Sequence, residues 1–100
     1  MHILQFFTKF SSYFILFDGD CRLEIMEMPN LSKSKNDPLK QYTGLAHFAI
    51  KVGNKPEVDR LTELIARDGF KVISEPRTTG DGYYESVILD PDGNRVELVA

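Results

Sequence analysis

The 100-residue sequence contains a single cysteine and no excess of positive charge. Cys21 cannot form a disulfide within the chain, which is typical of a reducing compartment, so we expect a cytoplasmic location. We interpret Cys21 as a small hydrophobic residue, because no His, Asn or Asp arrangement points to it as a nucleophile. A net charge of −3 leaves no basic stripe for a nucleic-acid backbone, so we expect no nucleic-acid partner.

The sequence also lacks a long uninterrupted apolar run. Residues 1–17 are rich in Ile, Leu and Phe, but polar residues such as Gln5, Thr8 and Lys9 interrupt them. The run is too short and too polar to span a bilayer. It has neither the basic region nor the small-residue cleavage site of a signal peptide. We therefore expect no membrane partner.

The clearest pattern in the sequence is a strand, a turn and a second strand near its end. Tyr84–Leu89 is rich in aromatic and branched residues, and Asp90–Asn94 contains the Pro, Asp, Gly and Asn that favour turns. In the strand predicted over residues 95–99, alternation places Glu97 on the face opposite to that of its two apolar neighbours.

A similar hairpin occurs earlier in the chain. Residues 13–26 repeat the pattern with a shorter turn, and Arg22–Ile25 matches Arg95–Leu98 position by position. Glu24 and Glu97 are the matching glutamates of the two copies. Such self-similarity indicates two copies of one small α+β unit, each ending in a strand with a central glutamate.

The second copy contains the signals of a complete β-α-β-β-β unit. Residues 45–52 alternate as a strand, and a helix is predicted between a capping residue, Asn54, and a terminating residue, Gly69. A further strand over residues 70–74 and a polar loop over residues 75–82 lead into the hairpin. Of the two faces of the first strand, the more apolar one should pack against the helix.

We predict an α+β fold of paired βαβββ units in one domain, residues 1–100, because the length suffices for one modest core. Residues 1–29 are a partial first copy, 30–43 a linker of Pro, Asn, Ser and Lys, and 44–100 the complete second copy. The first copy lacks counterparts of the opening strand and helix. Residues 1–10 fit either a strand or an irregular extension.

A candidate site follows from these strands. His47 lies on the less apolar face of its strand, so His47 and Glu97 would point into the same concave face of a half-barrel, and internal symmetry would add Glu24. An imidazole with carboxylates suits a divalent ion such as Zn²⁺, Ni²⁺, Mn²⁺ or Fe²⁺. Such an ion polarises a carbonyl, and a glutamate can move a proton. The alternative is an ordinary strand histidine beside a surface charge pattern of Arg95 and Glu97.

The second copy closely resembles the vicinal oxygen chelate superfamily, which includes glyoxalase I, extradiol dioxygenases and bleomycin-resistance proteins. The residues that carry the resemblance are 44–49, 75–85 and 90–97, and residues 11–29 also match well. In that superfamily, paired βαβββ units build a cupped site, and the metal ligands come from the first and last strands of each unit.

The resemblance implies the roles of particular residues. His47, Glu97 and Glu24 fall on metal-ligand positions, and Glu97 is the implied catalytic base. A fourth ligand would lie on the strand that the first copy lacks. Arg77 and Tyr84 are candidate substrate-binding residues.

The resemblance implies a metal-dependent lyase or isomerase, similar to lactoylglutathione lyase, that acts on a small carbonyl or thiol-adduct substrate. One alternative is a metal-free protein that binds a small molecule, as bleomycin-resistance relatives do. Another is an inactive, N-terminally truncated relative. Because the apolar face of the first copy has no helix to cover it, we also expect a homodimer, with exchanged elements as one form of it.

Overall fold

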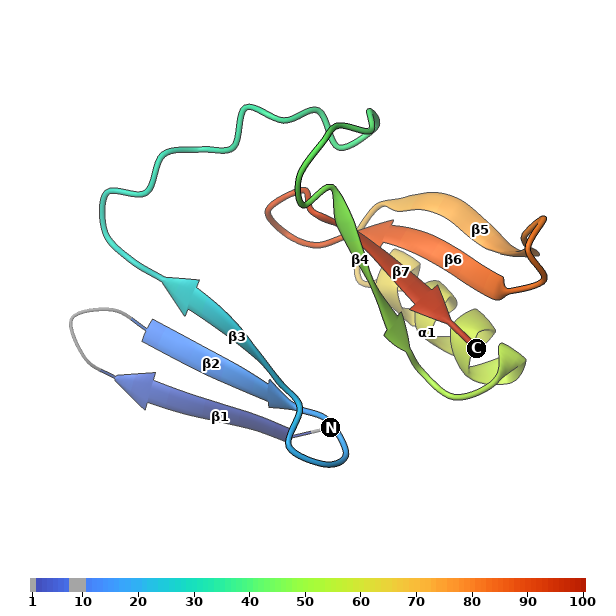
Figure 1. The fold of residues 1–100 in the computed structure, drawn as a ribbon, viewed down its shortest axis with the longest axis horizontal. Helices are drawn as coiled ribbons and strands as arrows, with labels where there is room; N and C mark the ends of the chain where they lie inside the picture. Colours follow the sequence, from blue (N-terminus) through green and yellow to red (C-terminus); the bar gives the residue numbers. More distant parts are fainter. Residues whose placement is uncertain (1, 8–10) are drawn as a thin grey trace. The chain divides into compact units, whose positions relative to one another are not determined.

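A computed structural model describes residues 2–7 and 11–100 of the chain (Figure 1). The chain forms two compact units, Met1–Lys35 and Asn36–Ala100, called the first and the second unit below. The boundary between them lies inside the predicted linker. In the part of the chain that the structure describes, no helix is long and apolar enough to cross a membrane.

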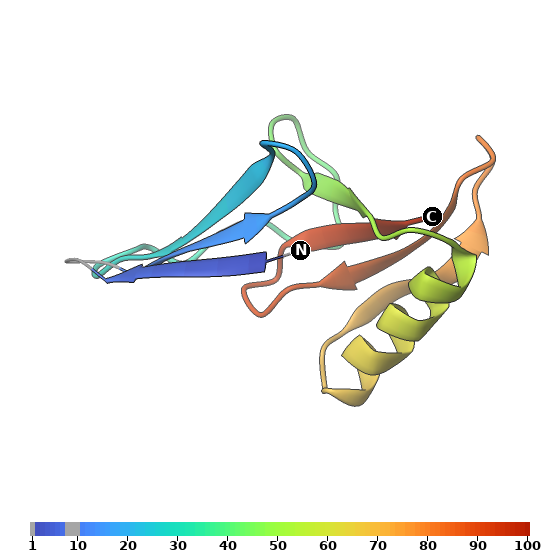
Figure 2. The same cartoon turned by 90° about the horizontal axis from the view of Figure 1, so that it is seen from below.

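The second unit is the predicted β-α-β-β-β arrangement. Its sheet has the strand order β4-β7-β6-β5, in which β4 and β7 are parallel and the other neighbours are antiparallel. Figure 2 shows the helix lying along one face of this sheet. The elements in chain order are β4 His47–Lys51, α1 Lys55–Arg67, β5 Val72–Thr78, β6 Tyr84–Leu89 and β7 Arg95–Val99.

Helix α1 begins and ends at the predicted residues. The side chain of Asn54 accepts a hydrogen bond from the backbone N–H of Glu57 at 3.0 Å, which satisfies one of the free donors of the first turn. At the other end, Gly69 has a φ of 92°, which a glycine adopts without strain. The backbone N–H groups of Gly69 and Phe70 reach back to the carbonyls of Ala66 and Ile65, which completes a Schellman motif.

The core of the second unit lies between α1 and the sheet. Val58 of the helix is fully buried, and its buried partners Ile88, Val96 and Leu98 come from β6 and β7. Phe48 and Ile50 of β4 pack against this cluster, as the more apolar face of that strand predicted. Because side chains alternate along a strand, this packing leaves the face that carries His47 and Glu97 on the side away from the helix.

Strand β5 is longer than the sequence predicted. The predicted strand ended at residue 74 and was followed by a polar loop, but β5 continues through Pro76 to Thr78. Two features of β5 explain the difference. It is the edge strand of the sheet, where a proline costs no ladder hydrogen bond, and register shifts occur on both sides of Ser74. These irregularities break the regular alternation on which the sequence prediction depended.

The first unit is an antiparallel sheet with the order β1-β2-β3. Its strands are β1 His2–Phe7, β2 Ser11–Leu16 and β3 Arg22–Glu27. Most of the ambiguous stretch over residues 1–10 is thus a strand, whereas residues 1 and 8–10 lie outside the described residues. Among residues 2–7 and 11–35 there are strands and no helix, which agrees with the predicted lack of the opening strand and helix.

The two hairpins have the same register, which supports the internal repeat. Phe14 pairs with Glu24 as Val87 pairs with Glu97. The prediction of a shorter first turn is wrong, because five residues separate the strands in both hairpins. In each turn, a backbone N–H bonds the carbonyl four residues later, at 3.0 Å in the first hairpin and 2.9 Å in the second.

Candidate metal and substrate site

The site of the second unit is built on the parallel neighbours β4 and β7. His47 pairs in register with Arg95, and Ala49 pairs with Glu97, so both site residues lie on the sheet face opposite α1. The His47 Nε2 atom lies 3.2 Å from the Glu97 Oε1 atom. Their side chains are 37% and 20% exposed, so a ligand can reach both. The structure thus brings together two of the three predicted metal ligands.

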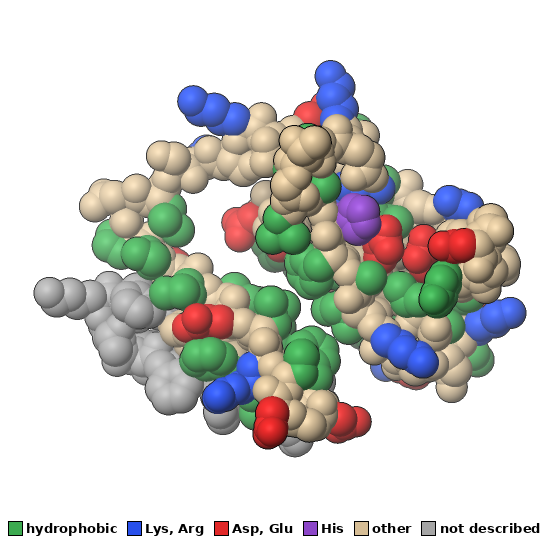
Figure 3. Space-filling model, in the orientation of Figure 1, with side chains coloured by type: hydrophobic (Ala, Val, Ile, Leu, Met, Phe, Trp, Pro, Cys, Tyr) green, Lys and Arg blue, Asp and Glu red, His purple; other side chains and the backbone are tan. Residues whose placement is uncertain are grey.

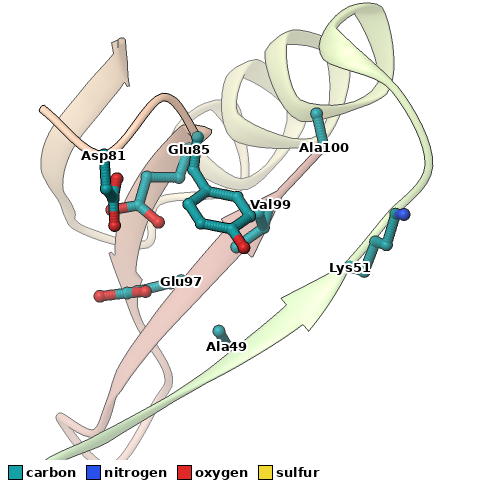
Figure 4. Close-up of a pocket in the computed structure, with 8 residues that line it drawn as sticks. Ala49, Lys51, Asp81, Glu85, Glu97, Val99 and Ala100 are labelled. Carbon is teal, nitrogen blue, oxygen red and sulfur yellow. The ribbon is translucent and has the colours of Figure 1, made fainter. Parts of the chain in front are cut away.

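An open pocket of about 620 Å³ is lined in part by Glu97 of this pair. Small apolar residues of β4, β7 and the end of the chain, namely Ala49, Val99 and Ala100, form part of its lining. Figure 4 shows the carboxyl groups of Asp81, Glu85 and Glu97 at one end and Lys51 at the other. The space-filling view likewise shows acidic side chains beside a histidine on the surface of the second unit (Figure 3). A small molecule would therefore lie over an apolar floor between groups of opposite charge.

Glu85 is a pocket residue that the sequence analysis did not select. It pairs with Val99 in the β6–β7 ladder, diagonally adjacent to Glu97 on the same face. Burial raises the pKa of the Glu85 carboxyl, and the charge of Glu97 and a hydrogen bond with it raise that pKa further. The alternation of residues 84–89 could have placed Glu85 on this face, had the site search included β6.

Asp81 differs from Glu85 although it lines the same pocket. A hydrogen bond from the Thr79 hydroxyl lowers the pKa of the Asp81 carboxyl, and backbone N–H groups lower it further. Asp81 therefore keeps its negative charge at this end of the pocket. The carboxyl groups of Asp81 and Glu85 are thus held in different environments. Asp81 accepts a hydrogen bond from a hydroxyl, whereas Glu85 faces the carboxylate of Glu97.

The two predicted substrate-binding residues lie on different faces. Arg77 pairs with Glu85 in the β5–β6 ladder, beside the acidic end of the site, where its charge opposes the rise in the Glu85 pKa. Tyr84 packs against the core on the α1 side, and its hydroxyl donates a hydrogen bond to Asp59. Tyr83, one residue earlier, lines the pocket instead. The structure therefore does not bring Tyr84 to the pocket, since neighbouring strand residues face opposite sides.

Glu24 lies in the first unit, near the middle of β3. The Ser12 hydroxyl on β2 donates a hydrogen bond to the Glu24 Oε2 atom at 2.7 Å. Within the described second unit, His47 and Glu97 form a pair of donors and not a group of three. That Glu24 joins them as a metal ligand stays a prediction.

The geometry of the His47–Glu97 pair fits a divalent ion. In zinc sites the bonds to imidazole nitrogen and carboxylate oxygen are about 2.0–2.2 Å, so two donors at a tetrahedral angle lie about 3.4 Å apart. The observed separation of 3.2 Å between Nε2 and Oε1 is that of a direct contact between the two side chains, and it is also close to this value. An imidazole with a carboxylate is also the donor set that Zn²⁺, Mn²⁺, Fe²⁺ and Ni²⁺ accept. These two residues can therefore supply two of the ligands of such an ion.

Arg95 connects the site to the linker. It neighbours His47 in the β4–β7 register, and one of its terminal nitrogens donates a hydrogen bond to the carbonyl of Pro38 at 3.1 Å. Its Nε atom is buried and has no hydrogen-bond partner among the residues that the structure describes. Arg95 thus ties the segment before β4 to the strand that carries Glu97, an arrangement that the surface charge interpretation of Arg95 did not predict.

Comparison with known proteins gives consistent results. Residues 4–98 match the model of the Glyoxalase/Bleomycin resistance protein/Dioxygenase superfamily. The uncharacterized protein YqjT of Bacillus subtilis (strain 168) is 40% identical over 60 residues, which are 57% of this chain and 47% of YqjT. The matched part thus spans about half the length of that relative.

Two solved structures illustrate the likeness in fold. Glyoxalase I from Zea mays is 28% identical with a TM-score of 0.66, and the match covers 91% of this chain and 31% of the maize chain. A glyoxalase/dioxygenase from Nostoc punctiforme has a TM-score of 0.70 at 22% identity, covering 91% of this chain and 59% of its own. At 22% identity, the likeness to the Nostoc protein shows a shared fold and nothing about activity.

Proposed function

Because the chain belongs to the Glyoxalase/Bleomycin resistance protein/Dioxygenase superfamily, we propose that it is a divalent-metal-dependent lyase or isomerase. The proposed substrate is a small carbonyl compound or its thiol adduct. The observation that carries the proposal is the His47–Glu97 pair, whose donor atoms lie 3.2 Å apart on the open face of the sheet beside a pocket.

The roles follow from the chemistry of these side chains. A bound Zn²⁺, Ni²⁺, Mn²⁺ or Fe²⁺ ion would polarise the substrate carbonyl, which makes the hydrogens on the adjacent carbon more acidic. His47 would bind through Nε2 in its neutral form, since only an unprotonated nitrogen is a ligand. Glu97 would take a proton from the carbon beside the carbonyl and return it to the former carbonyl carbon, while the hydroxyl proton of the thiol adduct moves to the former carbonyl oxygen, so that the substrate isomerises with no net gain or loss of protons.

Other residues of the chain complete the proposal. Glu24 is the proposed third ligand, by its equivalence to Glu97 in the repeat. Arg77, beside Glu85 on the pocket face of the sheet, is a proposed substrate-binding residue. Lys51 lies at the pocket end away from the carboxyl groups, where an ammonium group would favour a polar or anionic part of the substrate.

Calorimetric titration of the full chain with Zn²⁺, Ni²⁺ and Mn²⁺ tests the metal site. We expect one ion to bind per site. His47→Ala or Glu97→Gln should weaken this binding by more than about 100-fold, which exceeds the usual effect of removing a residue that only hydrogen-bonds a metal ligand. Glu63→Gln is the matched control, because Glu63 is an exposed residue of α1, which packs on the sheet face opposite His47 and Glu97. Absence of binding for all three ions would overturn the proposal.

Exchange of solvent deuterium into a small carbonyl–thiol adduct, followed by NMR, tests the role of Glu97. The native protein with bound metal should catalyse the exchange at the carbon beside the carbonyl. Glu97→Gln should abolish it, because an amide cannot accept the proton. Exchange at the native rate in Glu97→Gln would exclude Glu97 as the base.

A metal-free binding protein is the second candidate function. The pocket favours it because Tyr83 and the apolar residues Ala49 and Val99 offer binding surface that does not depend on an ion. A small molecule that raises the melting temperature in the presence of a chelator, equally for the native chain and Glu97→Gln, would support this function over the first.

A further inference from the structure

One row of side chains crosses the open face of the sheet in the second unit. In the strand register, Lys51 of β4 pairs with Val99 of β7, and Val99 pairs in turn with Glu85 of β6. Residues that pair directly lie on the same face of a sheet, and all three of these residues line the pocket. The row therefore places a basic and an acidic side chain on the two sides of one apolar residue.

The register also fixes the spacing of this row. Neighbouring strands lie about 4.8 Å apart, so the backbones at Lys51 and Glu85 are about 10 Å apart, with β7 between them. Figure 4 shows Val99 between the side chains of Glu85 and Lys51. Within the second unit, all of which the structure describes, Lys51 forms no ion pair with an acidic residue. The space over Val99 can thus hold a small polar molecule between the two charged groups.

The acidic end of the pocket offers more than one group to a cation. Asp81 lines this end together with Glu85, and it comes from the turn between β5 and β6. Tyr83 of the same turn also lines the pocket and is 57% exposed, and an aromatic ring attracts a cation. An ammonium group suits these neighbours, because carboxylates accept its N–H donors in charge-assisted hydrogen bonds.

We propose that the pocket binds a compact zwitterion, with the ammonium group at Asp81 and Glu85 and the carboxylate at Lys51. The ligand is thus a small molecule with an amino-acid group that lies across Val99. This inference names the substrate class of the proposed function and rests on that function for the reaction, but the binding itself needs no metal ion. The reactive end of the substrate would extend along β7 to Glu97, two residues from Val99 on the same face.

A matched set of thioethers tests the need for both charges. S-methylcysteine carries an ammonium and a carboxylate, methylthioethylamine carries only the ammonium, and methylthiopropionate carries only the carboxylate. Each is titrated into the isotope-labelled full chain with a chelator present, at low ionic strength, and the amide signal of Val99 is followed by NMR. We expect S-methylcysteine to bind at least about threefold more tightly than either analogue, because each exposed ion pair contributes modestly. Equal affinity for the three probes, or binding of none, would overturn the proposal.

Two variants each remove one of the charges. Lys51→Met keeps much of the chain length, and it should lower the affinity for S-methylcysteine to that for methylthioethylamine without weakening the binding of methylthioethylamine. Asp81→Asn should weaken S-methylcysteine without weakening methylthiopropionate. Lys71→Met, at an exposed position outside the pocket lining, is the control and should bind all three probes like the native chain.

A purely structural role gives a different pattern of affinities. If Lys51 only supported the fold, Lys51→Met would weaken all three probes alike, and that result would overturn the proposal. Circular dichroism shows whether each variant is folded. Lys51→Met alone decides the matter if Asp81→Asn disturbs the turn, because Lys51 is an exposed residue at the end of an edge strand.

The outcomes distinguish this inference from the proposed function. Preference for S-methylcysteine in a chain that binds none of Zn²⁺, Ni²⁺ and Mn²⁺ would leave the zwitterion site standing and overturn the proposed function. Metal binding that His47→Ala abolishes, together with equal affinity for the three thioethers, would overturn the zwitterion site and leave the proposed function standing.

Discussion

Glu85 shows how the fold alters the chemistry of a single residue. Burial and the neighbouring Glu97 raise the pKa of its carboxyl above the ordinary value, Asp81 adds to the effect, and Arg77 opposes it. The folded chain therefore binds this proton more tightly than the unfolded chain does. The contribution of Glu85 to stability is present at pH values below the unfolded pKa and is lost as pH rises through the folded pKa.

The pH dependence of unfolding tests this account of Glu85. In Glu85→Gln the group no longer titrates, so the melting temperature should fall less than that of the native chain as pH rises from about 4 to 8. The variant should be more stable than the native chain at the upper end of this range. Glu63→Gln, at an exposed helix position, should follow the native curve. Parallel curves for Glu85→Gln and the native chain would contradict a raised pKa.

The sequence predicted single residues well where alternation was regular. His47 and Glu97 were placed on one face because both lie in evenly alternating strands, and the structure brings their side chains into contact. Tyr84 was selected for its type alone, and it faces the helix, because the preceding residue, Tyr83, is the one that lines the pocket. Glu85 was missed because its position diagonal to Glu97 depends on the hairpin register, which cannot be determined from a single sequence.

At the scale of elements, helix α1 was the easiest part to predict. Its first turn depends on the Asn54 side chain, which satisfies the backbone N–H of Glu57. We expect Asn54→Ala to lower the free energy of unfolding by about 1 kcal/mol, the usual cost of losing such a cap, as measured by urea denaturation. Asn54→Ser, which keeps a capping oxygen, should lie close to the native value. Equal stability of the Ala and Ser variants would show that the cap does not stabilise the helix.

Strand β5 shows where local rules failed. Pro76 and the polar residues after Ser74 are typical of a loop, yet the segment pairs with β6 up to Thr78. The pairing is possible because β5 is at the edge of the sheet and the strand is irregular. Strand order is a property of the whole sheet, so the residues of β5 alone could not predict it.

At the scale of the whole molecule, the two copies of the repeat differ in how their apolar faces are covered. Leu98, under α1, is 6% exposed, whereas Ile25, its counterpart in the first unit, is 49% exposed. An exposed apolar sheet face is typical of an interaction surface. This contrast supports the expectation from the sequence that the chain forms a homodimer, which stays a prediction.

Sedimentation equilibrium tests the oligomeric state. We expect a species of twice the chain mass of 11.4 kDa. Ile25→Lys should shift the equilibrium to the monomer, because it places a charge on the surface that is expected to be covered. Lys33→Ala, in the linker, is the control. A monomer at all concentrations that calorimetry uses would contradict the prediction.

The family and the fold class could be predicted from the sequence, and both are confirmed. The family was predicted from the resemblance carried by residues 44–49, 75–85 and 90–97, and the repeated hairpin indicated two copies of one α+β unit. The equal length of the two turns and the contact between Ser12 and Glu24 required the structure, since both depend on the strand register.

The central claim is that His47 and Glu97 hold a divalent ion, and anomalous diffraction from crystals of the full chain grown with Zn²⁺ tests it most directly. The account predicts a zinc peak at about 2.0–2.2 Å from both His47 Nε2 and Glu97 Oε1. A saturating concentration of Zn²⁺ that leaves no peak at this pair, with the two side chains still in contact with each other, would contradict it.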